Sequence, residues 1–132
     1  MKKKIKRLAI IPARSGSKRI LNKNIKKFFD KPIINYSINN AFKSKLFKKI
    51  HISTDSLKLK RFIEKKNNIK IDFLRIKKLA SDQTPLVKVA SYVTKQYIKK
   101  KEMYDEIWLI YACSPLTMIK DLVKASKKYQ ST

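Results

Sequence analysis

The sequence predicts an α/β fold in which a doubly wound, mostly parallel sheet is covered by helices on both faces. Short apolar runs of strand length alternate along the chain with segments whose apolar residues recur at helical spacing, and such alternation is typical of parallel sheets with crossover helices. The chain has 132 residues, 43% of them hydrophobic, which is enough for one domain with its own core. Ligands of such open sheets bind beyond the carboxyl ends of the strands.

Four segments are predicted as strands. Residues 7–11 form a short apolar run closed by Pro12, which suits a strand buried on both faces. The other three strands are predicted from apolar runs between polar turns, at residues 49–53, 69–74 and 106–111. The loops expected at the carboxyl ends of the sheet cover residues 13–24, 53–56 and 112–116.

Four helices are predicted between and after these strands. The first follows Pro32, because proline is favoured in the first helical turn. The second covers about residues 57–66. The third is expected to have Thr84 as its cap and Pro85 in its first turn, and the fourth to follow a cap at Thr117.

The aromatic residues and the single histidine are expected to be structural. Tyr36, Phe42, Tyr97 and Trp108 have the spacing of core residues on their predicted helices and strand. His51 alternates with isoleucines along a predicted strand, which favours a partly buried structural histidine over a catalytic base.

Counts of three residue types limit the kinds of site that the chain can form. One cysteine and one histidine exclude an internal disulfide, a cysteine-rich zinc site and a multi-histidine metal site, so any metal needs oxygen ligands. With Gly16 as its only glycine, the chain contains neither the Gly-x-Gly-x-x-Gly turn nor a two-glycine Walker A loop. A phosphate site must therefore be built from side chains.

The formal net charge of +25 invites a nucleic-acid-binding interpretation, since polyanions bind basic surfaces through counterion release. The lysines are spread over every segment instead of being clustered, which favours a general compositional bias over a nucleic-acid partner. No apolar stretch has transmembrane length, and the basic residues 1–4 lead into only a short hydrophobic run. We therefore expect a cytoplasmic protein with no membrane partner.

The first loop carries the residues best suited to a polyphosphate. Fixed cations and hydrogen-bond donors must converge on such a ligand, and the planar fork of arginine pairs with two phosphate oxygens at once. The loop supplies both kinds of group in Arg14, Ser15, Ser17, Lys18, Arg19, Lys23 and Asn24.

The residues around this loop resemble a known family. Ile-Ile-Pro-Ala-Arg-Ser-Gly-Ser-Lys-Arg at 10–19, followed by Asn-Lys-Asn-Ile at 22–25, resembles the signature loop of the acylneuraminate cytidylyltransferases, which make CMP-sugars from nonulosonic acids. Four later segments are similar to further parts of that family, in the same order, and together they extend the resemblance over essentially the whole chain: residues 31–38, 52–55, 73–85 and 111–116.

The resemblance implies a CTP site and a reaction. The anomeric hydroxyl of the sugar attacks the α-phosphorus of CTP and pyrophosphate leaves. Lys23 is expected near the transferred phosphate, so Arg14 and Lys23 are the expected catalytic residues. The nucleotide-binding residues implied by the resemblance are Arg14, Ser17, Lys18 and Lys23 on the phosphates, Asn24, and Arg75 with the backbone of Ala80, Ser81 and Asp82 on the cytosine edge.

The sugar-binding residues implied by the resemblance are Tyr111 and Ala112. They stand where many family members have a Gln-Pro pair, and this version resembles the branch that acts on pseudaminic acid. A ketodeoxyoctulosonate cytidylyltransferase, which has a similar fold and loop, is the nearest alternative within the enzyme class.

The resemblance also sets expectations about domain organisation and metal. Residues 1–132 correspond to the N-terminal nucleotide-binding part of a single cytidylyltransferase domain. Family members continue into a dimerisation segment and an Asp-x-Asp motif that binds Mg²⁺, so we expect magnesium as the cofactor, its ligands beyond residue 132 and a homodimer at full length. Asp55 is either an active-site carboxylate or a helix cap. The alternatives are an inactive fragment of the enzyme and a basic nucleic-acid-binding module.

Overall fold

The centre of the fold is β1 (Arg7–Pro12), which the sequence analysis predicted as a doubly buried strand. The computed structural model describes residues 4–16, 26–112 and 119–131. In it β1 pairs in parallel with β4 (Lys49–Ser53) on one side and with β5 (Glu106–Leu109) on the other. Residues 8–11 of β1 have no exposed surface. The carboxyl ends of all three strands therefore lie at the same edge of the sheet.

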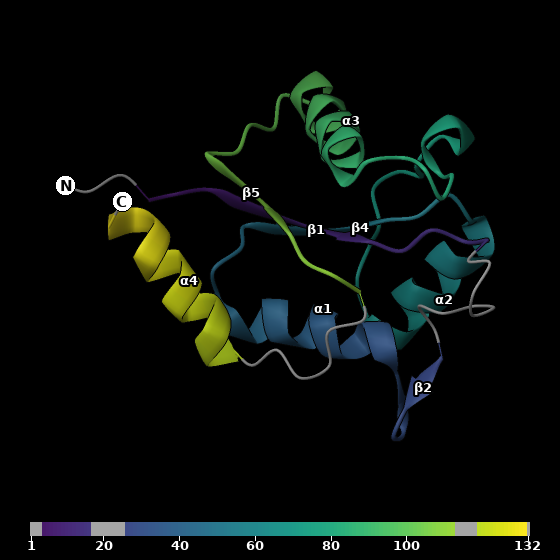
Figure 1. The fold of residues 1–132 in the computed structure, drawn as a ribbon, viewed down its shortest axis with the longest axis horizontal. Coiled ribbons are helices and arrows are strands. Elements are labelled where there is room, and N and C mark those ends of the chain that lie inside the picture. The colour runs from purple at the N-terminus through teal and green to yellow at the C-terminus, as the bar shows by residue number, and fades with distance from the viewer. Residues whose placement is uncertain (1–3, 17–25, 113–118, 132) are drawn as a thin grey trace.

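Helices cover both faces of this sheet (Figure 1). The helix α3 (Leu86–Lys99) lies on one face. Three helices lie on the other: α1 (Ile33–Ser44), α2 (Leu57–Asn67) and α4 (Ile119–Ser131). The predicted class, a parallel sheet between helices, is confirmed.

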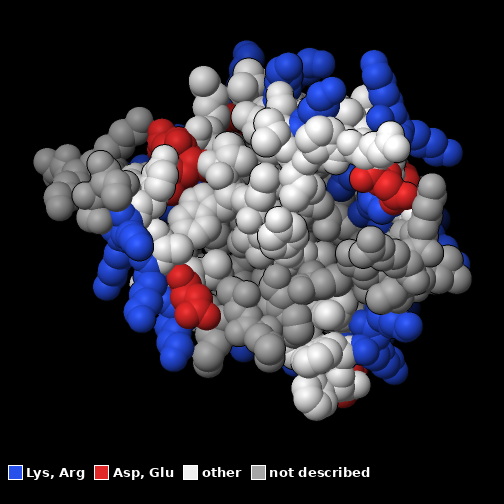
Figure 2. Space-filling view, viewed as in Figure 1, with Lys and Arg blue, Asp and Glu red and all other residues white. Residues whose placement is uncertain are grey.

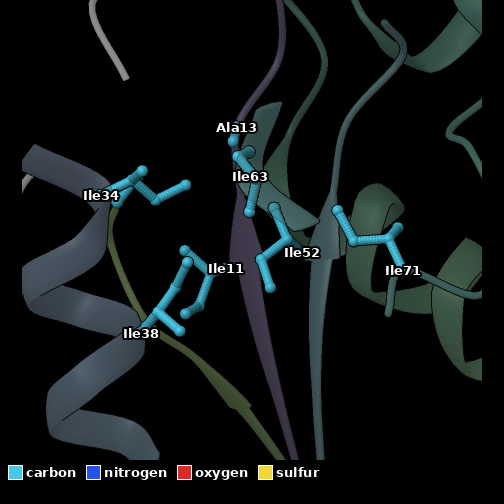
Figure 3. Packing of buried hydrophobic residues seen from close by; sticks show 8 residues of the cluster. Ile11, Ala13, Ile34, Ile38, Ile52, Ile63 and Ile71 are labelled. Atoms are coloured by element: carbon cyan, nitrogen blue, oxygen red, sulfur yellow. The ribbon is translucent and has the colours of Figure 1, made fainter. Parts of the chain in front are cut away.

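Alternate residues of β1 supply the two halves of the core. Leu8 and Ile10 pack with Val93 and other apolar residues of α3, because successive side chains of a strand point to opposite faces. Ile11 packs on the other face, and Figure 3 shows its side chain beside that of Ile38 on α1. Burial of large aliphatic side chains on this scale is the main stabilising contribution to such a fold.

The predicted strand at residues 69–74 is wrong. This segment is extended but belongs to no sheet in the described structure. Two of its amides bond to Glu64 on α2: the N–H of Ile69 donates to the Glu64 carbonyl at 3.4 Å, and that of Ile71 donates to the Glu64 carboxylate at 2.9 Å. Just after the segment, the N–H of Arg75 donates to the Thr54 carbonyl at 2.7 Å. Ile71 is nevertheless buried, which explains why the apolar pattern resembled a strand.

Several element boundaries also differ from the predictions. A short hairpin, β2 (Lys27–Phe28) and β3 (Lys31–Pro32), precedes α1. β5 is shorter than predicted and ends at Leu109. A 3₁₀ turn forms at Lys77–Leu79.

The expected cap and first-turn proline of α3 are also wrong. Pro85 itself stands at the N-cap, and the hydroxyl of Thr84 bonds to that of Ser81 at 2.9 Å. The expected cap at Thr117 lies outside the described residues. None of the helices that the structure describes has the length and apolarity needed to cross a bilayer.

The aromatic predictions were partly confirmed. Tyr97 is buried in the core, Tyr36 and Trp108 are half-buried, and Phe42 is wrong because 61% of it is exposed. The spacing of apolar residues along α1 does not reveal that Phe42 is exposed.

His51 is a structural histidine, and it is more deeply buried than expected. Its ring stacks on Phe73 and its Nδ1 lies 3.0 Å from the hydroxyl oxygen of Tyr97. That hydroxyl also lies 2.8 Å from the Asp72 carboxylate. Because a hydroxyl has one proton and the carboxylate only accepts, the Tyr97 hydroxyl donates to Asp72 and accepts from His51 Nδ1–H. The Nε2 atom then has no hydrogen-bond partner among the described residues.

Stability is expected to fall as His51 is protonated. Burial lowers the pKa of His51 from 6.5 to about 4, partly opposed by Asp72. The unfolded chain therefore binds a proton more readily, so this contribution is fully present above the unfolded pKa and is lost as pH falls from 6.5 toward 4. Urea unfolding between about pH 7 and about pH 4.5 should show a loss of about 2 kcal/mol from this residue.

The variant His51→Gln is the control, since glutamine can donate to Tyr97 but does not titrate in this range. The carboxylates titrate in both proteins, so the difference between the two pH profiles isolates the histidine. Equal pH dependence in both proteins would contradict the assignment.

Candidate functional site

A cavity of about 500 Å³ opens at the carboxyl edge of the sheet, where loops after β1 and β4 meet the segment after residue 76. This is the edge at which open α/β sheets bind ligands, and the volume falls in the ordinary range of small-molecule sites. Among the described residues, the cavity is lined by Arg14, Ser15, Gly16, Asp55, Lys77, Ala80, Ser81, Asp82 and Gln83.

One wall of the cavity is the start of the signature loop. The N–H of Ala13 donates to the carbonyl of Ser53 at 2.8 Å, which extends the pairing of β1 with β4 by one bond. The chain then turns at Gly16, whose φ of 68° lies in the left-handed region that glycine adopts without penalty. A Cβ on Gly16 would have room, so the backbone conformation is what calls for the only glycine of the chain.

Asp55 anchors this loop. Its carboxylate accepts hydrogen bonds from the backbone N–H of Ser15 at 2.8 Å and from the Ser15 hydroxyl at 2.7 Å. Burial acts to raise the pKa of Asp55, but the hydrogen bonds from Ser15 outweigh it, and the pKa lies below its ordinary value. The carboxylate is therefore ionised at neutral pH. The expected helix-cap role is wrong, because Ser56 caps α2 by accepting from Leu59 N–H at 3.1 Å.

Arg14 reaches across the cavity. Its guanidinium lies 3.1 Å from the carbonyl oxygen of Gly16 and forms an ion pair with Asp82 on the opposite wall. The pair joins two of the residues that the sequence analysis assigned to the nucleotide. It leaves both side chains partly exposed, at 27% for Arg14 and 35% for Asp82.

Arg75 supports the wall of the cavity at residues 77–83 through buried hydrogen bonds. It is 4% exposed, and its guanidinium donates to the hydroxyl and the carbonyl of Ser53, at 2.9 and 2.8 Å, and to the carbonyl of Leu79 at 3.2 Å. It therefore ties the end of β4 to the 3₁₀ turn that leads into Ala80. Arg75 is not among the residues that line the cavity, so its predicted contact with cytosine remains a prediction.

The two residues expected at the sugar lie at the carboxyl end of β5, outside the lining of this cavity. Tyr111 is 68% exposed, whereas Ala112 is buried in the core beside Ile11 and Ile34. The hydroxyl of Ser37 on α1 lies 2.8 Å from the carbonyl oxygen of Tyr111 and 3.1 Å from that of Ala112. Their role at the sugar remains a prediction.

Four of the expected nucleotide contacts lie outside the described residues: Ser17, Lys18, Lys23 and Asn24. The structure adds two residues that sequence reasoning did not select, Lys77 and Gln83, on the wall opposite the signature loop. In a chain where 34 residues are lysine or arginine, the sequence does not single out Lys77, and only the fold shows that it lines the same cavity as Arg14.

A parallel sheet between helices, with arginine and lysine lining a cavity at its carboxyl edge, places this chain among the open α/β proteins whose ligand sites lie at that edge. Comparison with known proteins narrows this class. A family model described as "Cytidylyltransferase" matches residues 8–132. This chain therefore belongs to the cytidylyltransferase family.

Individual relatives agree with this assignment. The pseudaminic acid cytidylyltransferase of Campylobacter jejuni is 38% identical over 120 residues, which cover 91% of this chain and 51% of that protein. The N-acylneuraminate cytidylyltransferase of Escherichia coli is 34% identical over 125 residues, which cover 94% of this chain and 28% of that protein. The chain thus spans about half, or less, of the length of these relatives.

A solved structure supports the fold. CMP:2-keto-3-deoxy-manno-octonic acid synthetase, in a complex with CTP, superimposes with a TM-score of 0.75 at 15% identity, over 96% of this chain and 48% of that chain. At this identity the likeness establishes the α/β fold and no more.

Replacing Arg75 with lysine should loosen the wall at residues 77–83. A single ammonium does not reach Ser53 and Leu79 in the way that the guanidinium fork does. The loss of buried charged hydrogen bonds should lower the free energy of unfolding by about 2 kcal/mol. Urea unfolding measures this loss, and hydrogen exchange at the Ala80 amide, which bonds to Lys77, should quicken.

Arg61→Lys is the matched control for that variant, because Arg61 is exposed on α2. Unchanged stability in Arg75→Lys, or an equal loss in the Arg61 variant, would show that the bonds of Arg75 do not support the wall.

Proposed function

We propose that this protein binds CTP in the cavity at the carboxyl edge of the sheet and serves in the transfer of CMP to a nonulosonic acid, with release of pyrophosphate. The observation that carries the proposal is the position of Arg14. The family's signature loop places this arginine in the described cavity, facing the segment to which the resemblance assigns the cytosine.

The charges of the cavity suit a polyphosphate. Arg14 and Lys77 line it, and an arginine fork can pair with two phosphate oxygens. Of the two carboxylates, Asp55 is bound to Ser15 and Asp82 to Arg14. A phosphate that replaced Asp82 as the partner of Arg14 would keep the guanidinium neutralised while binding the ligand.

The charge distribution supports a localised site over a nucleic-acid surface. Figure 2 shows lysine and arginine side chains in separate groups at the top, the right and the lower left of the visible face, with acidic residues among them. A polyanion of extended shape requires a continuous basic stripe. Selective binding of CTP over ATP and GTP is the result that separates the two functions.

The proposed sugar is a nonulosonic acid of the pseudaminic type. Support comes from the Tyr111-Ala112 pair and from relatives whose names carry pseudaminic acid, in Campylobacter jejuni and Helicobacter pylori. The proposed cellular site is the cytoplasm, and the proposed assembly at full length is a homodimer. A panel of nonulosonic acids assayed for pyrophosphate release with CTP tests the sugar.

We propose magnesium as the cofactor on the basis of the family resemblance alone. Within the described ranges, no group of three His, Cys, Asp or Glu side chains gathers to hold a metal. Mg²⁺ in nucleotide sites is bound through one or two carboxylates and the substrate phosphates. We assign the metal to neither Asp55 nor Asp82, because the resemblance implies a later Asp-x-Asp motif for it, beyond residue 132.

Arg14→Ala should weaken CTP binding. Removal of a charged, two-pronged contact with phosphate should cost about tenfold or more in affinity. Isothermal titration calorimetry with the chain and CTP measures the change. Arg61→Ala removes the same charge from α2, away from the cavity, and should leave the affinity as it is. An unchanged affinity in Arg14→Ala would remove Arg14 from the site.

Asp82→Asn should strengthen CTP binding. The ion pair between Arg14 and Asp82 must break before the guanidinium binds phosphate, and pairs this exposed contribute about 0.2–1 kcal/mol. Loss of that competition should tighten CTP by at most about fivefold, while the backbone of Asp82, which the resemblance assigns to cytosine, is kept. Weaker binding in this variant would mean that the Asp82 carboxylate itself contacts the nucleotide or its metal.

A further inference from the structure

We propose that Asp55 is a positioning residue of the nucleotide site. It acts as a two-pronged clamp on Ser15 that fixes the first turn of the signature loop and so directs Arg14 into the cavity. The inference rests on the proposed function for the identity of the ligand, but its geometry comes from the described residues alone.

The clamp uses both oxygens of one carboxylate on one residue. Oδ1 accepts from the backbone N–H of Ser15 at 2.8 Å and Oδ2 accepts from its hydroxyl at 2.7 Å. With its backbone and side chain both held, Ser15 has a fixed orientation relative to the end of β4. Because Arg14 directly precedes Ser15, the hold of Asp55 on Ser15 also sets the direction in which the Arg14 side chain leaves the backbone.

The clamp also matches the charges around it. The guanidinium of Arg75 favours the ionised form of Asp55, and the Ser15 bonds do the same. The carboxylate lines the cavity, yet both of its oxygens point at the loop. A negative charge beside a polyphosphate site would oppose binding unless it were compensated, and Ser15 together with Arg75 supplies that compensation.

The loop has few other attachments among the described residues. Ala13 bonds to Ser53 before the turn, and Arg14 bonds to the loop's own carbonyls and to Asp82. Asp82 is the partner that a phosphate would replace. The Ala13 bond holds the chain before the turn, so among the bonds named here those of Asp55 hold the turn itself when the ligand binds.

Asp55→Ala should weaken CTP binding by about tenfold, the scale of lost hydrogen bonds to a charged group. The decisive measurement is a double-mutant cycle with Arg14→Ala. If Asp55 acts through Arg14, the double variant should bind CTP within about twofold of Arg14→Ala alone, because the two losses are not additive. Additive losses would overturn the clamp.

Two further variants test whether the lower CTP affinity comes from a general loss of structure. In Asp55→Asn the amide oxygen can still accept from the Ser15 N–H and the amide nitrogen can donate to its hydroxyl, so most of the affinity should return. Glu64→Ala is the control, since the Glu64 carboxylate also accepts a backbone N–H, that of Ile71 in the segment after α2, and does not line the cavity. It should lower stability and leave CTP affinity unchanged. An equal loss of affinity in both alanine variants would overturn the proposal.

Inorganic tripolyphosphate separates this inference from the proposed function, because it carries phosphates without the base. Non-additivity with tripolyphosphate but no preference for CTP over ATP would overturn the proposed function and support the clamp. A CTP preference with additive losses for both probes would overturn the clamp alone. If the wild-type chain binds neither probe, both proposals fall.

Discussion

The carboxyl end of β4 holds both walls of the cavity. The Ser53 carbonyl accepts from Ala13 of the signature loop and from the Arg75 guanidinium, and the Thr54 carbonyl accepts from the Arg75 amide. Asp55 then binds Ser15. Backbone groups past the end of a ladder must find partners elsewhere, and here the partners come from the two segments that enclose the site. The spacing of the walls follows from three consecutive residues.

Carboxylates are scarce in this chain, which has 9 acidic residues against 34 basic ones. Asp55 and Asp72 join distant segments, since Asp55 binds Ser15 and Asp72 binds Lys49 and Tyr97. Glu64 joins α2 to the segment that follows it by binding the Ile71 amide. The pKa of each of these carboxyls is lowered despite the opposing effect of burial. Loss of one carboxylate should therefore matter more than loss of one lysine, since excess cations remain but the acceptor does not.

Sequence reasoning failed where a backbone partner could not be known. Residues 69–74 have the apolar content of a strand, but the amides of Ile69 and Ile71 bond to Glu64 on α2, and the amide of Arg75, just after the segment, bonds to Thr54. Thr84 was predicted as a helix cap because it is a hydroxyl residue before a helical run, but its hydroxyl bonds to that of Ser81. In both cases the local pattern reported burial or polarity correctly. The hydrogen-bond partner was decided by the packing of other segments.

The sequence by itself determined the alternation of strands and helices, the place of the loop at the carboxyl edge and the absence of the common glycine-rich phosphate loops. These follow from hydrophobic period, from the single glycine and from the order of motifs, all of which are local properties. The tertiary structure decided that Asp55 clamps Ser15, 40 residues away, and that Arg14 meets Asp82, 68 residues away. Contacts between residues so far apart in the sequence depend on which strands pair in the sheet, and no local sequence pattern encodes that pairing.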